Sequence, residues 1–312
     1  MTTRGLLVLP PRRVRGIRRF NGAWLEHQIR RLIPIPEQAI FWIRYASPEL
    51  VDRLARLNPL VCVYECSDAL HFTPGLEIPP WDRIFEAAER ELTSYADALV
   101  VPHAGLGARY AAWGANVRVI AHGVDLHPLG VRPRLAPSPV VVGFVGTLDR
   151  RVDEAIVRAV ATAEPGWRVR LVGPVAEGFD ARAFDDLANV SVEPPVPHEQ
   201  LGEVLSTFDL GFMPYFDHPM YLGMSPLKNL ELLAAGIPAV ARPSPALEPF
   251  RDLVTMATSP EEFVDALRRA LQDDNVDAVR ARRRRAEDQT WDVNHRQMLD
   301  LLSELIVAKQ AQ

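Results

Sequence analysis

The sequence predicts an α/β protein with two Rossmann-like, doubly wound domains that face a cleft. The chain has 312 residues, enough for about two domains. Short strand-like runs alternate with helical stretches, which is typical of parallel sheets built from βαβ units. The alternation is interrupted once, over 129–139, by a proline-rich stretch without a hydrophobic period. We interpret that stretch as an interdomain linker.

The predicted elements divide between the two halves of the chain. In the first half we expect strands at 5–10, 39–43, 60–64, 98–102 and 117–120, and helices at 23–32, 48–57, 82–95 and 106–113. In the second half we expect strands at 140–145, 167–172, 190–192, 210–213 and 237–241, and helices at 151–163, 198–207, 226–235, 260–272 and 290–307. The expected units are therefore an N-terminal domain over 1–136, a C-terminal domain over 137–289 and a final helix over 290–312.

Composition and charge narrow the class of protein. The apolar fraction is 48% and the charged fraction 24%, as in soluble globular proteins, and the net charge of −5 gives no reason to expect nucleic acid binding. No run of 18 apolar residues predicts a membrane span, and the N-terminus lacks a signal-peptide core. Two cysteines cannot form a disulfide framework. We therefore expect a cytoplasmic protein.

Several well-known site motifs are missing from the sequence. After the 140–145 strand, Gly143 and Gly146 do not have the GxGxxG spacing, and neither a P-loop, a GxSxG elbow nor an HExxH motif occurs. There is no Asp-x-Asp pair to hold a divalent metal against a diphosphate, and the eight histidines are scattered. We therefore expect neither a metal nor a cofactor.

The helix predicted at 226–235 is the best candidate for an anion site. Ser225 suits the N-cap, Pro226 the first helical position and Gly236 the residue after the helix end. The N-terminus of a helix offers unpaired N–H groups and positive dipole character to a phosphate. Lys228, one of only two lysines, lies in the first turn, where the dipole disfavours a cation. An anion between the lysine and the amides would explain that choice.

Glu231 follows Lys228 by three residues on the same helical face. Its neighbours are mostly apolar, so its carboxylate needs hydrogen-bond donors. The two hydroxyls of a ribose would supply them, since a carboxylate can accept two bonds at once. The alternative is a surface Lys–Glu pair worth a few tenths of a kcal/mol.

At these residues the sequence resembles the retaining glycosyltransferases of the GT-B architecture, in particular family 4 and its teichuronic-acid-type branch. That group shows a P-x-K-x-x-E-x-x-A-x-G-x-P block, which is filled here by Pro226, Lys228, Glu231, Ala234, Gly236 and Pro238. Four further blocks occur in the family's order, at 96–101, 119–125, 142–148 and 208–214. The closing helix with Trp291 is similar to a family helix that crosses back onto the first domain.

The resemblance implies a role for each matching position in the second domain. The diphosphate of a nucleotide-sugar donor would contact Gly146, Thr147, Arg150 or Arg151, Ser225, Pro226, Leu227 and Lys228. Glu231 would bind the ribose, and the loop 195–198, with Val196, would lie beside the nucleobase. The expected donor is a UDP-, GDP- or TDP-sugar.

In the first domain the resemblance places Asp68 and His71 at the cleft, so that Lys228, Arg151, His71 and Asp68 are the expected catalytic residues. The acceptor would be a glycan, a lipid-linked molecule or a small molecule. His122 replaces an asparagine of the family and is expected to be structural. Gly223 stands where many relatives carry an acidic residue that contacts the donor sugar, so recognition of the sugar must differ.

The implied activity is transfer of a sugar with retention of anomeric configuration and without a metal. Two alternatives stay open: a GT-B nucleotide-sugar epimerase, and a non-catalytic subunit that binds nucleotide or glycan. Six arginines within the first 19 residues also predict peripheral contact with the inner face of a membrane or with an anionic acceptor.

Overall fold

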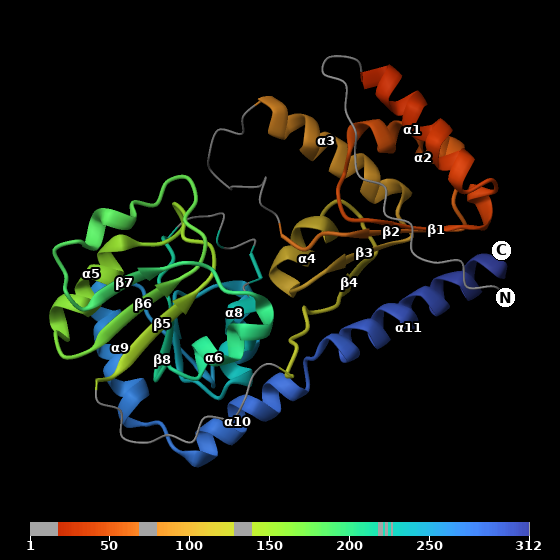
Figure 1. The fold of residues 1–312 in the computed structure, drawn as a ribbon. Helices are drawn as coiled ribbons and strands as arrows, with labels where there is room; N and C mark the ends of the chain where they lie inside the picture. The colour runs from red at the N-terminus through yellow and green to blue at the C-terminus, as the bar shows by residue number, and fades with distance from the viewer. Residues whose placement is uncertain are drawn as a thin grey trace.

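The computed structural model describes residues 18–68, 80–127, 139–217, 221, 224–225 and 227–311. It contains two parallel sheets with helices packed against them (Figure 1). The strand predicted at 5–10 and most of the linker predicted at 129–139 lie outside the described residues. Among the described residues, no helix is both long enough and apolar enough to cross a membrane.

The first sheet has four strands in the order β1-β2-β3-β4. They are β1 (Ile40–Ile43), β2 (Val61–Glu65), β3 (Ala98–Val101) and β4 (Val117–Val119). Because this order is also the order along the chain, right-handed crossovers place the connecting helices on one face. The core on that face joins the sheet to α1 (Arg18–Leu32), α2 (Pro48–Leu57), α3 (Pro80–Tyr95) and α4 (Ala104–Ala111).

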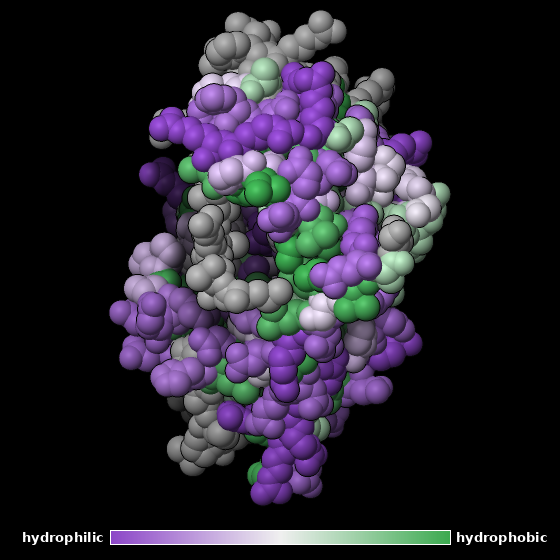
Figure 2. Space-filling model, turned by 90° about the vertical axis from the view of Figure 1, so that its right-hand side faces the viewer, coloured by the Kyte–Doolittle hydropathy of each residue, from purple (hydrophilic) through white to green (hydrophobic). Residues whose placement is uncertain are grey.

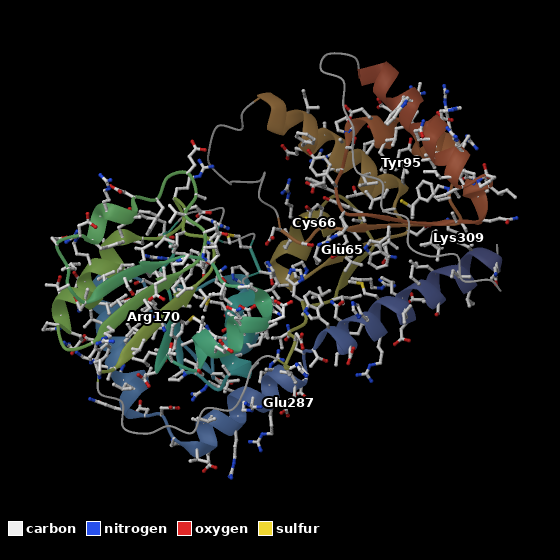
Figure 3. The ribbon with its side chains drawn as sticks, viewed as in Figure 1. Glu65, Cys66, Tyr95, Arg170, Glu287 and Lys309 are labelled. Atoms are coloured by element: carbon white, nitrogen blue, oxygen red, sulfur yellow. The ribbon has the colours of Figure 1, made fainter. Side chains whose placement is uncertain are left out.

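The opposite face of the first sheet is covered by α11 (Trp291–Gln310) from the end of the chain. Leu301 and Leu305 of α11 pack against alternate residues of β2 and β3, which point to that face. An ion pair of 2.7 Å between Lys309 and Asp97 fixes the far end of the helix (Figure 3). Helices thus lie on both faces, as a doubly wound fold requires, but one face depends on a helix that is remote in sequence.

The second sheet has six parallel strands in the order β10-β9-β8-β5-β6-β7. They are β5 (Val141–Val145), β6 (Arg168–Val172), β7 (Val190–Glu193), β8 (Leu210–Met213), β9 (Ala239–Ala241) and β10 (Val254–Met256). Its helices are α5 (Glu154–Ala163), α6 (Leu201–Leu205), α8 (Leu227–Ala234), α9 (Pro260–Gln272) and α10 (Val276–Glu287). The order reverses between β5 and β8, and open α/β sheets bind ligands beside the carboxyl ends of the strands at such a switch point.

Most predicted elements agree with the structure, and the differences have local causes. The helices predicted at 48–57 and 260–272 and the strand at 210–213 match residue for residue. The helix predicted over 198–207 is interrupted: a 3₁₀ turn precedes α6, which ends at Leu205 because Ser206 and Thr207 return their hydroxyls to backbone carbonyls. The short strand β10 was not predicted.

The chain connects the two units twice, and hydrogen bonds join the connections. The Gln289 amide donates to the His122 carbonyl at 2.9 Å, and the Asn294 amide donates to the Ala121 carbonyl at 2.7 Å. The segment after β4 and the start of α11 therefore lie side by side.

Gly143 in the middle of β5 permits close packing beneath the switch point. A Cβ atom at this position would overlap the ring of Phe208, a buried and rigid neighbour. We expect Gly143→Ala to lower the free energy of unfolding by about 1–3 kcal/mol through overpacking, as measured by urea denaturation. Gly166→Ala is the matched control, because a Cβ there meets nothing within 4 Å. Equal stabilities of the two variants would contradict this account.

Candidate functional site

The candidate site lies at the switch point, where Gly146 follows β5. The Gly146 N–H donates to the Val172 carbonyl at 2.9 Å, which holds the loop after β5 against the end of β6. Gly146 has a φ of +149°, which side chains of L-residues rarely tolerate. A Cβ atom there would overlap Cε of Lys228. The absence of a side chain therefore makes room for the lysine.

Lys228, in the first turn of α8, crosses the end of β5 with its ammonium group. The Nζ atom lies 5.7 Å from the ring centroid of Phe144 and 5.9 Å from that of Tyr215. Cation–π attraction at these distances favours the charge without neutralising it. No described residue forms a hydrogen bond or an ion pair with Nζ. Lys228 is thus a positioned cation whose charge acts on Asp68, Asp149 and Glu231, without an ion pair within 4 Å among the described residues.

Glu231 lines a small cavity beside β5 together with Lys228. The two side chains do not form an ion pair within 4 Å, so the surface-pair alternative does not describe this geometry. Desolvation raises the pKa of Glu231, opposed by the charges of Lys228 and His198. No described residue donates a hydrogen bond to the carboxylate, which leaves its acceptor capacity open to a ligand.

Arg151 is already paired. Its guanidinium donates to Asp149 through Nε at 2.8 Å and through Nη2 at 2.6 Å. Desolvation acts to raise the pKa of Asp149, but the hydrogen bonds from Arg151 outweigh it and lower that pKa. Sequence reasoning missed Asp149, although the Asp-x-Arg spacing at 149–151 was visible. The positive charge of Arg151 is therefore partly balanced by Asp149.

Asp68, which follows the end of β2, contacts the segment of the second unit that precedes α8. Its Oδ1 accepts a hydrogen bond of 3.2 Å from the Ser225 N–H, two residues before α8 begins. Partial desolvation raises the pKa of Asp68, opposed by that hydrogen bond and by the charges of His122, Arg151 and Lys228. The Asp68 carboxylate thus accepts a hydrogen bond from a backbone N–H group that an anionic ligand would also bind.

The other predicted residues are distributed around this centre. Thr147 is half-buried beside Gly146, Arg150 is exposed, and Val196 is half-buried in the loop after β7. Leu227, at the start of α8, is 37% exposed. Burial lowers the pKa of His122, which fits the expected structural role. His71 and Pro226 lie outside the described residues.

The carboxyl end of α8 forms as the sequence predicts. The Gly236 N–H donates to the Leu233 carbonyl and the Ile237 N–H donates to the Leu232 carbonyl, both at 2.9 Å. This pair of bonds is the Schellman pattern. The end of the helix is thereby fixed, so the positions of Lys228 and Glu231 follow from the register of α8.

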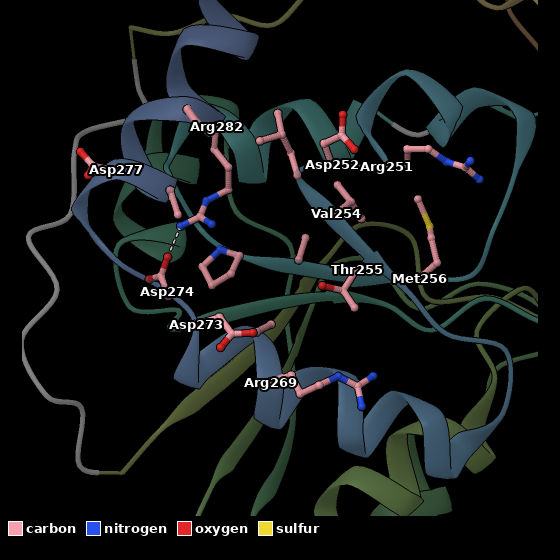
Figure 4. A pocket seen from close by; sticks show the side chains of 16 residues that line it. Arg251, Asp252, Val254, Thr255, Met256, Arg269, Asp273, Asp274, Asp277 and Arg282 are labelled. Carbon is pink, nitrogen blue, oxygen red and sulfur yellow. Dashed lines mark hydrogen bonds and ion pairs between the residues drawn. The ribbon is translucent and has the colours of Figure 1, made fainter.

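Two other features of the described residues bear on the location of the site. No group of three histidine, cysteine, aspartate or glutamate side chains is placed to hold a metal ion there. A groove of about 810 Å³ lies along the edge strand β10 (Figure 4). It includes Pro238 and Ala239 at the amino end of β9, and its buried Arg282–Asp274 ion pair satisfies both charges. Ligands of parallel sheets bind at the opposite strand ends, so we do not place the site there.

The fold is that of the GT-B architecture. Residues 150–302 match the family model described as Glycosyl transferase-like. The chain is 24% identical over 287 residues to TuaH of Bacillus subtilis strain 168, a protein named for glycosyl transfer in teichuronic acid biosynthesis; the match covers 84% of this chain and 71% of that protein. These findings confirm the resemblance to GT-B glycosyltransferases that the sequence blocks indicate.

Solved structures agree on the fold. Sucrose-phosphate synthase from Thermosynechococcus elongatus superposes with a TM-score of 0.74 at 19% identity, over 97% of this chain and 82% of its own. HepE from Anabaena, solved with UDP and glucose, superposes with a TM-score of 0.69 at 14% identity, over 94% and 84% of the two chains. At these identities the likeness establishes the GT-B arrangement of the chain.

The contact between Gly146 and Lys228 is testable by a double-mutant cycle. We expect Gly146→Ala to displace the lysine and to weaken binding of a nucleoside diphosphate about tenfold, as one charge-assisted contact is lost. In a Lys228→Ala background the same change should cost much less, because the overlap no longer exists. Calorimetric titration of the four proteins measures the coupling, and additive effects would contradict the geometry.

Proposed function

We propose that the protein transfers a sugar from a nucleotide diphosphate donor to an acceptor hydroxyl, with retention and without a metal. The observation that carries this proposal is the arrangement on α8: Lys228 and Glu231 line one small cavity at the switch point, and neither forms an ion pair within 4 Å with a described residue. A diphosphate and a ribose diol offer the complementary charge and hydrogen bonds. The likeness to TuaH and to HepE supports the assignment.

In this proposal the barrier falls because the departing diphosphate is stabilised. Lys228 and the N–H groups at the start of α8 are aimed at the charge that develops on the leaving group. Arg151 adds a cation whose orientation Asp149 fixes. No step requires a metal, because lysine, arginine and helix amides supply the positive charge.

Glu231 would accept hydrogen bonds from both ribose hydroxyls, and the loop around Val196 would edge the nucleobase. Binding of the ribose would supply the donors that the desolvated carboxylate lacks in the free protein. UDP- and GDP-sugars present both hydroxyls, whereas the deoxyribose of a TDP-sugar offers only its 3′-hydroxyl. The nucleobase would be read by the loop after β7.

Asp68 would link donor binding to the acceptor side. An incoming diphosphate would compete with Asp68 for the Ser225 amide and release the carboxylate. The freed carboxylate would then lie at the mouth of the cleft, where an acceptor hydroxyl must approach. We assign donor binding to 137–289 and the acceptor side to 1–136, with a glycan, lipid-linked or small acceptor, and we keep peripheral membrane contact through the N-terminal arginines within the proposal.

A non-catalytic subunit that binds nucleotide or glycan is the second candidate function. Gly223, in place of an acidic residue that contacts the donor sugar in many relatives, favours it. Such a subunit would bind a nucleoside diphosphate at the same residues and transfer nothing.

The first prediction of this proposal concerns the two residues of α8. We expect Lys228→Ala to weaken binding of UDP, GDP or TDP, and of pyrophosphate, by about ten- to a hundredfold, as a charge-assisted contact is lost. Glu231→Gln should weaken nucleoside diphosphate binding but scarcely affect pyrophosphate, which has no ribose.

The free Glu231→Gln protein should also be more stable at neutral pH. A carboxyl pKa that is raised in the folded state means that ionisation opposes folding, and this loss of stability is fully present once the pH exceeds the folded pKa. Calorimetry and thermal melts measure both effects. Wild-type nucleotide affinity in both variants would locate the donor site elsewhere.

The second prediction concerns the reaction itself. A thermal-shift screen of UDP-, GDP- and TDP-sugars would first identify a donor. With that donor the product should keep the anomeric configuration of the donor sugar, as read from proton NMR couplings. Turnover should be unchanged by EDTA, because among the described residues no group of three histidine, cysteine, aspartate or glutamate side chains is placed to hold a metal ion. A product of inverted configuration would refute retention, and loss of turnover with EDTA would refute metal independence. Nucleotide binding without transfer to any acceptor would instead favour the non-catalytic subunit.

A further inference from the structure

Hydrophilic side chains cover much of the molecular face shown in Figure 2, whereas Arg242, directly after β9, is only 7% exposed. It lies at the carboxyl end of a strand, the end at which parallel sheets bind their ligands. Its guanidinium, however, is engaged inside the protein. Nε donates to the Tyr215 carbonyl at 2.8 Å, and Nη2 lies 3.8 Å from the Asp153 carboxylate. Arg242 therefore acts on its neighbours rather than on a ligand.

The buried carboxylate of Asp153 caps the helix α5. It accepts a hydrogen bond of 3.0 Å from the Ala155 N–H. The Asp153 N–H in turn donates to the Pro214 carbonyl at 2.6 Å. Through these contacts Arg242 joins three segments that are far apart in sequence: the end of β9, the start of α5 and the residues after β8.

The segment 214–216, after β8, contacts the backbone of one cation of the donor site. Tyr215 forms an antiparallel bridge with Val152, and the Phe216 N–H donates to the Arg151 carbonyl at 2.8 Å. The backbone at Arg151 is therefore fixed to the segment that Arg242 holds.

The ring of Tyr215 contacts the second cation, Lys228. Tyr215 is only 1% exposed, and its ring packs nearly at right angles to that of Phe144, with 5.9 Å between the centroids. Nζ of Lys228 lies 5.9 Å from the centroid of the Tyr215 ring. Because a closely packed interior transmits strain, a shift of the Tyr215 backbone must move this ring and weaken its attraction for the ammonium group.

We propose that Arg242 is a positioning residue of the donor site, which holds the Tyr215 carbonyl and thereby keeps the Lys228 ammonium group in place. The guanidinium suits this task because its fixed fork presents Nε to one acceptor and Nη2 to another at the same time. The binding of a diphosphate at Lys228 rests on the proposed function, whereas the contacts of Arg242 do not.

The test uses the fact that Lys228 and Lys309 are the only lysines of the chain. Protein with isotope-labelled lysine therefore gives two ε-methylene signals in a proton–carbon NMR spectrum, and Lys228→Arg assigns them. Ring currents should shift the Lys228 signal upfield of the Lys309 signal, since Lys309 pairs with Asp97 instead. In Arg242→Gln we expect the Lys228 signal to move at least halfway toward that of Lys309.

Calorimetric titration with pyrophosphate gives the second measurement. Arg242→Gln should weaken binding about fivefold, less than Lys228→Ala does, because the ammonium group is displaced rather than removed. Arg282→Gln is the matched control: Arg282 is also buried, with Nε on the Gly236 carbonyl at 3.0 Å and Nη2 paired with Asp274, but it contacts the chain before β9. The control should lose stability and keep both the Lys228 signal and the pyrophosphate affinity.

A Lys228 signal at its wild-type position in folded Arg242→Gln would overturn the proposal, and so would an equal displacement in Arg282→Gln. Unchanged pyrophosphate affinity in Arg242→Gln, where the wild type binds, would overturn it too. If Arg242→Gln fails to fold, Asp153→Asn decides by the same spectrum, because asparagine keeps the cap of α5 and removes the carboxylate beside Arg242.

The spectrum needs no ligand, so its result is separate from the proposed function. A displaced Lys228 signal in Arg242→Gln, together with a wild type that does not bind pyrophosphate, would support the positioning role and contradict the donor site.

Discussion

The position of the Lys228 ammonium depends on residue 146 having no side chain. A Cβ atom there would overlap the lysine, so only glycine at this position allows the end of β5 to lie so close to the Lys228 side chain. The rings of Phe144 and Tyr215 then hold the ammonium group by cation–π attraction, which does not neutralise its charge. The sheet order places this contact at the switch point, and the Schellman end of α8 fixes the helix register that brings Glu231 beside it. The relative position of Lys228 and Glu231 follows from these constraints.

The free protein holds this site in an electrostatically unfavourable state. A lysine lies where the dipole of α8 favours an acid, and partial burial disfavours the charge of the Glu231 carboxylate. Asp68 from the first unit accepts a hydrogen bond from the Ser225 N–H group, just before the helix, and so takes in part the place of an anionic ligand. A ligand with a diphosphate and a diol relieves each of these deficits. Binding energy would therefore come largely from removing costs that the folded chain already carries.

The sequence predicts this fold well because its information is local. Capping residues, a proline, a lysine and a glycine in fixed spacing define α8 within fifteen residues, and apolar runs define the strands around it. Contacts between segments that are distant in the sequence leave no such local pattern. The Asp68–Ser225 bond joins residues 157 positions apart, and no periodicity reports such a pairing. The cover that α11 gives the first sheet was implied by the family resemblance and not by a local pattern. The Asp149–Arg151 pair was local, yet the resemblance drew attention to the arginine alone.

The helix α8 lines two separate spaces. Lys228 and Glu231 line the small cavity beside β5, and Leu227 and Asn229 line a cavity shared with the first unit. A rigid helix of eight residues cannot move one face without the other. The two units are also joined by the paired crossings near His122 and Gln289, which leave rotation about that pair as the simplest relative motion. That rotation would change the separation of Asp68 and Ser225, because the two residues belong to different units.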